Sequence, residues 1–361
     1  MVDEIDFTWL IAFVFAWLFL AIFIDLVTST RTNLHEATID GNYQWAKKLL
    51  DRGIDPDITK RKGMTPLFCA IKNDRIEIVK LLLDYGANIN LEYQGNWPPV
   101  IGEYSFNPLL GSIILDRQEI TQLLVDRGAE KGIHYFCAIG DKDTVTNFLQ
   151  QRPELIDYKL NTLGVMHFAI FSGSLELIDL LLEKGTDIDD FSKMSGTPLH
   201  LALSRKTTDI QIIRHLIKLG ANLESFRGSY TPLSIAASSN NIPIVDLLIR
   251  AGANLDPSGF NVTYPLIAAV ECERIEIASI LLENGANIHR RQRLNGDTVL
   301  HVAVSNNDIL MTDLLIHYGA NVDECSYFGS TPLGLSHSNI KLEKIEKLLL
   351  QYGADNYGTN E

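Results

Sequence analysis

The sequence of 361 residues predicts an all-α solenoid of about ten helix-turn-helix repeats with projecting finger turns, preceded by one N-terminal transmembrane helix. Two observations carry this prediction. An uncharged apolar run, "FTWLIAFVFAWLFLAIFI", occupies residues 7–24. From residue 32 onward, two short motifs recur in fixed order about every 33 residues, as expected when each unit buries its apolar face only against its neighbours.

The apolar run has the length of a membrane-spanning helix. Its 18 residues rise by about 27 Å in a helix, which is close to the thickness of the hydrocarbon core of a bilayer. Leu26 and Val27 extend the apolar length past Asp25. We therefore expect a short extracytoplasmic segment, a transmembrane helix and a linker over residues 1–6, 7–27 and 28–31.

The basic residues around this segment predict its orientation. No Lys or Arg precedes it, whereas Arg31, Lys47 and Lys48 follow it. The positive-inside rule therefore places the long C-terminal part in the cytoplasm of a single-pass membrane protein. A buried core helix stays an alternative. So does a cleaved signal peptide with export of the rest of the chain, although the acidic start "MVDEID" and the sequence "DLVTSTR" suit cleavage poorly.

The composition argues against several classes of function. A net charge of −14 argues against general nucleic-acid binding, which requires a basic surface. The four cysteines are far apart and show no metal-ligand spacing, so we expect reduced thiols and no metal site. The sequence contains no phosphate-binding glycine loop, serine-nucleophile motif or zinc-protease motif. It therefore predicts neither a cofactor nor catalysis.

Two motifs define the repeats. One closes each unit, with clear copies "GANI" at Gly86 and "GANV" at Gly319. The other opens it, as in "TPLHLA", where Thr197 can cap a helix and Pro198 occupies its first turn. A second helix follows in "IQIIRHLIKLG", and Gly220 supplies its left-handed end. The repeats cover residues 32–357, with approximate starts at residues 32, 65, 107, 133, 164, 197, 231, 264, 298 and 331.

A period near 33 residues combined with T-P-L-H-x-A resembles the ankyrin repeat, and the resemblance covers residues 32 to about 357. With its N-terminal apolar run, the chain resembles single-pass, membrane-anchored ankyrin proteins of bacteria. The resemblance implies a protein-binding solenoid whose finger tips and exposed first-helix positions line a concave groove. It also implies that the histidines at the fourth motif position are structural and hydrogen-bond to the neighbouring turn. These are His35, His167, His200 and His301.

Carried over by position, the ankyrin groove gives a set of candidate protein-binding residues on the fingers. For each of them, packing against the neighbouring finger is an equally open alternative. The set comprises Arg61, Lys62, Arg227, Tyr230, Phe260, Leu294, Asn295, Tyr327 and Phe328. The basic stretch from Lys60 to Lys62 is also a candidate for contact with anionic lipid, because it follows the predicted membrane span.

One finger is about nine residues longer than the repeat pattern requires, namely "NLEYQGNWPPVIGEYSF" over residues 90–106. Its aromatic residues Tyr93, Trp97 and Tyr104 make it a second candidate for partner binding, with a self-packed loop as the alternative. An enzyme site in the irregular region 87–165 is a further rival. It would have to use the few titratable residues there, chiefly Glu92, Glu103, His134 and Asp141.

These features together predict a membrane-tethered scaffold or adaptor that binds a protein partner without catalysis. The partner is a protein, the membrane is engaged through the N-terminal helix, and no nucleic acid is bound. The alternative function is that of an exported ankyrin-repeat effector or inhibitor, acting outside the cytoplasm after removal of the N-terminal segment.

Overall fold

The computed structural model of the chain describes residues 34–60, 63–95, 104–160, 162–193, 195–205, 209–259, 262–292, 294–337 and 342–355. Within this part of the chain, no helix combines the length and the apolar character that crossing a bilayer requires. The predicted membrane span over 7–27 and the linker after it lie outside the described residues. The chain divides into two compact units, residues 1–138 and residues 139–361.

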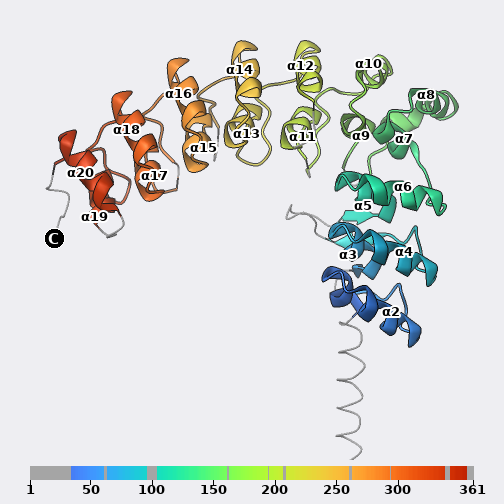
Figure 1. The fold of residues 1–361 in the computed structure, drawn as a ribbon. Helices are drawn as coiled ribbons and strands as arrows, with labels where there is room; N and C mark the ends of the chain where they lie inside the picture. The colour runs from blue at the N-terminus through green and yellow to red at the C-terminus, as the bar shows by residue number, and fades with distance from the viewer. Residues whose placement is uncertain are drawn as a thin grey trace, which may run out of the picture. The chain divides into compact units, whose positions relative to one another are not determined.

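In the first unit, short helices follow one another in pairs. A helix over residues 34–39 is followed by α2 (Tyr43–Asp51), α3 (Pro66–Lys72), α4 (Ile76–Asp84), α5 (Pro108–Ile114) and α6 (Gln118–Asp126), and α7 (Ile133–Ile139) begins in this unit. The helix α3 packs against α4 and α5, while α4 packs against α2 and α6. The first helices of successive repeats therefore stack on one another, and so do the second helices (Figure 1).

The second unit repeats this arrangement. Its elements are α8 (Lys142–Gln151), the 3-10 helix η2 (Pro153–Ile156), α9 (Val165–Ser172), α10 (Leu175–Glu183), α11 (Pro198–Ser204), α12 (Ile210–Lys218), α13 (Pro232–Ser238), α14 (Ile242–Arg250), α15 (Pro265–Glu271), α16 (Ile275–Glu283), α17 (Val299–Ser305), α18 (Ile309–His317), α19 (Pro332–His337) and α20 (Glu343–Gln351). The helices α11, α13, α15, α17 and α19 form one layer, here called the inner helices. The helices α12, α14, α16, α18 and α20 form the other layer, here called the outer helices (Figure 1).

The inner helices begin where the sequence provides a cap and a proline. Thr231 accepts a hydrogen bond from the amide of Ser234, and Pro232 occupies the first helical position. A helix of seven residues makes few internal hydrogen bonds, so its stability depends on packing. In α15, the residues from Pro265 to Val270 are all buried, which places the core between the two layers.

The outer helices end at glycines in the left-handed conformation. Gly220 has a φ of +92°, and its amide donates to the carbonyl of Ile217 at 3.0 Å. The amide of Ala221 donates to the carbonyl of Leu216 at 3.0 Å, so two orphan carbonyls of the last turn are satisfied. The finger that links each repeat to the next starts at this point.

The prediction of an all-α solenoid of stacked helix-turn-helix repeats is confirmed, and one finger adds a short strand pair. The long finger contains two short antiparallel strands, β1 (Tyr93–Gly95) and β2 (Tyr104–Phe106), with Tyr93 opposite Phe106. The extra length of this finger supplies two arms that pair their backbone groups with each other, and aromatic residues favour extended backbone. In the sequence Trp97 falls between β1 and β2, and it lies outside the described residues.

Candidate protein-binding face

The four motif histidines are buried near the start of the first helix of their repeats, next to the following finger. The Nε2 atoms of His35, His167 and His301 contact the carbonyl oxygens of the residues that precede the next repeat, at 2.7, 3.0 and 2.8 Å. At the other ring nitrogen, Nδ1 of His200 accepts a hydrogen bond from the amide of Thr197 at 3.3 Å. The ring of His301 makes both contacts, since its Nδ1 also accepts the amide of Thr298 at 3.2 Å, and it thus connects the start of its own helix to the following finger.

Burial lowers the pKa of three of the motif histidines. Burial, together with the positive charge of Arg227, lowers the pKa of His200 to about 4. Burial also lowers the pKa of His167 and of His301. At neutral pH these rings are therefore uncharged, which suits a buried hydrogen-bonding role.

The fifth repeat departs from this scheme because Gly164 stands where six of the ten repeats have threonine. A Cβ atom at Gly164 would collide with Oδ2 of Asp190, whose carboxylate occupies the place of the missing side chain. The same oxygen lies 3.7 Å from Nδ1 of His167, and Lys159 forms an ion pair with Oδ1 of Asp190. A carboxylate from the next finger here replaces the threonine.

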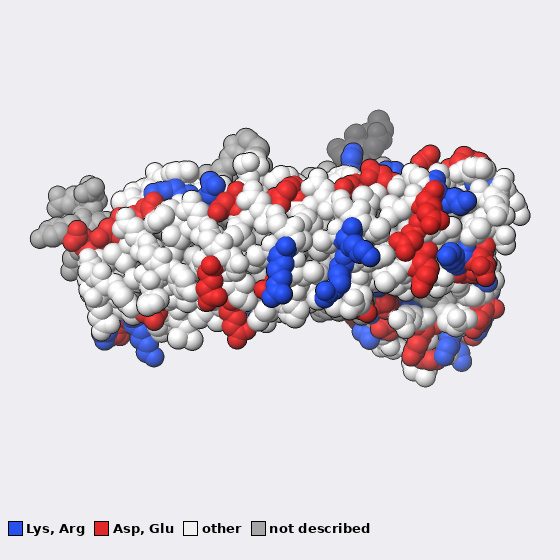
Figure 2. Space-filling model, turned by 90° about the horizontal axis from the view of Figure 1, so that it is seen from above, with Lys and Arg blue, Asp and Glu red and all other residues white. Residues whose placement is uncertain are grey.

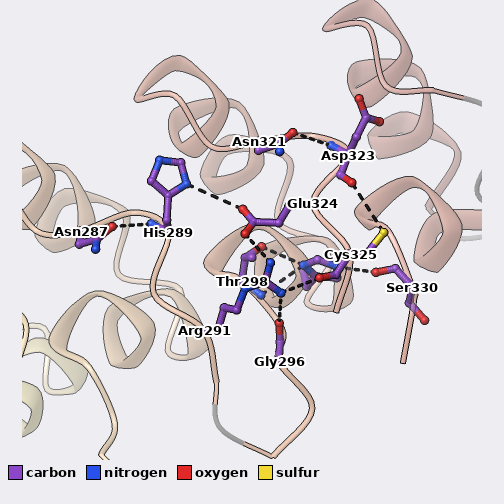
Figure 3. A network of polar contacts seen from close by, with 11 residues as sticks. Asn287, His289, Arg291, Gly296, Thr298, Asn321, Asp323, Glu324, Cys325 and Ser330 are labelled. Atoms are coloured by element: carbon purple, nitrogen blue, oxygen red, sulfur yellow. Dashed lines mark hydrogen bonds and ion pairs between the residues drawn. The ribbon is translucent and has the colours of Figure 1, made fainter. Parts of the chain in front are cut away.

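The fingers over 285–297 and 319–330 are connected through Arg291. Its Nη2 atom contacts Oε1 of Glu324 at 2.5 Å, and its Nη1 atom donates to the carbonyl oxygens of Cys325 and Gly296 at 2.5 and 3.1 Å. His289 faces the other oxygen of Glu324, with 3.8 Å between Nδ1 and Oε2. Figure 3 shows the guanidinium group of Arg291 between the two fingers, so that one side chain holds both.

The tips of the same two fingers lie against each other. The amide of Tyr327 donates to the carbonyl of Asn295 at 2.8 Å. Gly296 has a φ of +71°, and a Cβ atom there would collide with the ring of Tyr327. The ring of Tyr327 therefore packs on the backbone of Gly296. For Tyr327, the structure thus shows packing against the neighbouring finger.

Large apolar side chains remain exposed on these tips, although the fingers are held firmly. Leu294 is 87% exposed, Phe328 79% and Tyr327 63%. Exposed side chains of this size in one region are typical of interaction sites, since their burial against a partner is favourable. We call the surface formed by Leu294, Tyr327 and Phe328 the tip patch.

A cavity of about 280 Å³ lies next to the tip patch and includes Leu294 in its wall. The other lining residues come from the inner helix α15 and from three successive fingers: Ser229, Val262, Thr263, Ile267, Glu271 and Gln292. The carboxylate of Glu271 accepts a hydrogen bond from Nε2 of Gln292 at 2.7 Å. Burial raises the pKa of Glu271.

The remaining candidates from the sequence are dispersed. Arg227 donates from Nη1 to Oγ of Ser204 at 2.8 Å, and Tyr230 is bonded to Arg227 through backbone groups. The side chain of Asn295 is bonded to Asp297 at the finger tip. Tyr93 and Tyr104 belong to the two strands of the long finger. Arg61, Lys62, Trp97 and Phe260 lie outside the described residues.

The structure describes three of the four residues that the rival enzyme hypothesis would use. Among the residues that the structure describes, no group of three or more His, Cys, Asp or Glu side chains is arranged to hold a metal ion. His134 is buried in α7, and Glu92 is exposed. Asp141 caps α8 by accepting the amide of Thr144 at 3.0 Å. Glu103 lies outside the described residues.

Glu271 and Gln292 are the site residues that sequence reasoning missed. A signal for Glu271 is present in the repeats themselves. The inner helices of the sixth to ninth repeats read "PLHLALS", "PLSIAAS", "PLIAAVE" and "VLHVAVS", so that a glutamate stands at the last position, where the other three have serine. Gln292 carries no such signal, because its side chain becomes relevant only through its contact with Glu271.

Comparison with known proteins places this geometry in a family. The family model for ankyrin repeats in three copies matches residues 18–93, 34–135, 133–227, 166–258, 199–292 and 266–360. An ankyrin repeat protein of fowlpox virus, FPV031, is 31% identical over 159 residues, which is 43% of this chain and 37% of the viral protein. Mouse protein phosphatase 1 regulatory subunit 27 is 37% identical over 87 residues, or 24% of this chain and 55% of that protein.

The fold is also found among solved structures. The crystal structure of the human ASB11 ankyrin repeat domain has a TM-score of 0.50 and 22% identity, covering 63% of this chain and 99% of that domain. The matches to the fowlpox and mouse relatives span about a third and about half of the length of those proteins. Because the ankyrin repeat models match most of its length, the chain belongs to the ankyrin repeat family.

Proposed function

We propose that the chain is a non-catalytic scaffold that binds a protein partner through the tip patch and the adjoining cavity. The observation that carries this proposal is the combination of exposed apolar side chains with a firmly held backbone. Ordering flexible loops reduces affinity, so tips already fixed by Arg291 and by the Tyr327–Asn295 hydrogen bond are suited to recognition. The mouse relative is named as a regulatory subunit of a phosphatase, which is in keeping with a regulatory role through protein binding.

Photocrosslinking tests the site directly. We expect Phe328→benzoylphenylalanine in the full chain, irradiated in the cells that produce it, to give one discrete crosslinked protein. The matched control is Leu310→benzoylphenylalanine, because Leu310 is 70% exposed at the start of the outer helix α18 and lies outside the tip patch. Equal crosslinking from both positions would show that the tip patch has no special role.

The long finger is the second candidate for the partner site, on the strength of its sequence. Its excess length and its aromatic residues around Trp97 support this alternative. The same photoreactive group at Trp97 distinguishes the two candidates. A discrete product from position 97 and none from position 328 would transfer the proposal to the long finger.

We also propose that the scaffold is tethered to a membrane as a single-pass protein, with the repeats in the cytoplasm. The support is the uncharged run over 7–24 and the basic residues that follow it, from Arg31 to the Lys60–Lys62 stretch, which would face anionic lipid. The alternative is an exported protein with a cleaved N-terminal segment. Sequencing of the mature N-terminus distinguishes the two, since only the tethered form retains residues 1–24.

Charges within the apolar run test the tether. The double variant with Phe15→Arg and Leu18→Arg places two charges at mid-bilayer, each of which costs about 2.5–3.5 kcal/mol on insertion scales. We expect the variant to leave the membrane fraction or to be degraded. Retention in the membrane pellet after carbonate extraction would contradict the proposed tether.

A further inference from the structure

The inner helices of the second unit are almost free of charge. Among Asp, Glu, Lys and Arg, the helices α11, α13, α15, α17 and α19 contain only Glu271, at the end of α15. The outer helices α12 to α20, in contrast, carry both signs of charge, as the interspersed red and blue side chains in Figure 2 illustrate. Glu271 is therefore the one Asp, Glu, Lys or Arg residue of these five inner helices.

Among the residues that the structure describes, no cation is paired with Glu271. The hydrogen bond that its carboxylate receives comes from Gln292, an uncharged donor. The described arginines of the adjacent finger are engaged elsewhere, since Arg290 pairs with Asp256 and Arg291 with Glu324. Arg274, three residues along the chain, donates instead to the carbonyl of Ser238. The Glu271 residue is exposed, so a cation of a partner can reach its carboxylate and form a charge-assisted hydrogen bond with it.

The cavity beside Glu271 has both polar and apolar lining residues. Ile267 from α15, Val262 from one finger and Leu294 from the next line the same cavity. A lysine or arginine side chain has the matching chemistry, because its methylene stem packs on apolar surface while its head group pairs with a carboxylate. Apolar residues flanking the cation would then meet the tip patch, of which Leu294 is the part that also lines the cavity.

We infer that the partner of this chain presents a basic segment, in which a lysine or arginine inserts beside Glu271 and neighbouring apolar residues cover the tip patch. This inference rests on the proposed function and names the chemistry of the partner for the same site. The negative charge of the whole chain, −14, favours the approach of such a segment.

Peptide selection tests the inference with a defined probe. The full chain, reconstituted in nanodiscs, is used to select from a phage library of random twelve-residue peptides. The affinities of the selected peptides are then measured for the chain itself, for Glu271→Gln and for Phe328→Ser. The matched control is Glu276→Gln, which removes the same charge from the outer helix α16 of the same repeat. Melting temperatures verify that each variant is folded.

We expect the selected peptides to combine lysine or arginine with an apolar residue. Their affinity should fall about tenfold or more for Glu271→Gln and remain unchanged for Glu276→Gln. Two outcomes would overturn the basic partner and leave the proposed function standing. In both, the peptides bind Phe328→Ser more weakly, but they either are neutral or acidic or bind Glu271→Gln with unchanged affinity. If the affinity of the selected peptides changes for neither variant, the proposed site itself is contradicted. If no selected peptide binds Glu271→Gln more weakly than the unchanged chain, the inference is overturned.

Discussion

Two sets of finger junctions in the second unit are held in different ways. In the fingers from residue 185 to residue 287, an acidic residue stands four positions after the glycine that ends the outer helix. Its side chain accepts a hydrogen bond from a backbone amide of the next finger. Oxygens of Asp189, Glu224 and Asp256 accept the amides of Asn222, Asn254 and Asn287 at 3.0, 2.8 and 3.0 Å. At the next junction this position is His289, and Arg291 and Glu324 form the link instead.

The difference bears on how a finger becomes a recognition element. In the first set, short side chains bind backbone amides near the base of the finger. In the second, the long side chain of Arg291 holds both fingers by their carbonyls, while the tip residues Leu294 and Phe328 remain exposed. A finger that is held by contacts to its backbone can thus expose apolar side chains at its tip, and these side chains contribute little to the stability of the finger.

Acid gives the largest expected effect in the part of the chain that contains the first set. His200, bonded to the start of α11, is neutral when folded, with a pKa of about 4 against about 6.5 when unfolded. As pH falls from 6.5 to 4, the unfolded chain binds a proton that the folded chain does not, so the free energy of unfolding should fall by roughly 3 kcal/mol for this residue. Denaturation at several pH values measures it.

The control for the acid experiment is His200→Gln. This variant lowers stability at neutral pH, and the slope of stability against pH between 6.5 and 4 should become shallower because the titrating group has gone. An unchanged slope would show that His200 is not responsible for the loss.

Removal of Arg291 tests the second set. Arg291→Ala leaves Glu324 without its cation and removes the donor to two carbonyls, so we expect a loss of about 2 kcal/mol in the free energy of unfolding. Hydrogen exchange should accelerate at the amides of residues 319–330. The control is Arg250→Ala, whose ion pair with Asp246 is exposed and should contribute less than about 1 kcal/mol. Equal losses from the two variants would remove the distinction between the junctions.

A pair of glycines gives a smaller and sharper test. Gly296 and Gly329 both have positive φ, +71° and +77°, but only at Gly296 would a Cβ atom meet another side chain, the ring of Tyr327. Gly329→Ala should cost about 1 kcal/mol from backbone strain. Gly296→Ala should cost more, because the ring must also move. Equal melting temperatures would show that Tyr327 is not packed on Gly296.

Much of the fold follows from short-range sequence signals. Thr197 and Pro198 set the start of α11, and Gly220 sets the end of its outer partner, because caps and positive φ depend on neighbouring residues. The exposed finger tips could also be predicted from the sequence, since Leu294 and Phe328 occupy finger positions of the repeat. The two strands of the long finger could not be predicted, because their pairing depends on contacts between segments nine or more residues apart.

The part of the site that sequence reasoning missed depends on distant neighbours. Glu271 matters because Gln292 and Leu294, more than twenty residues later, complete its cavity. In the same way, Asp190 takes the place of a threonine side chain at Gly164, from a finger that follows α10. An alignment of the repeats shows that these positions are unusual. Only the packed structure shows which side chain contacts each unusual residue.

The central claim is that the tip patch binds the partner, and the affinity of the crosslinked partner for Phe328→Ser tests it most directly. We predict that the variant binds about thirtyfold more weakly, a loss of about 2 kcal/mol, because Phe328 acts as an exposed anchor. Its melting temperature should equal that of the control Leu310→Ser, which should bind the partner with unchanged affinity. Equal affinities of Phe328→Ser and Leu310→Ser for the partner would contradict the claim.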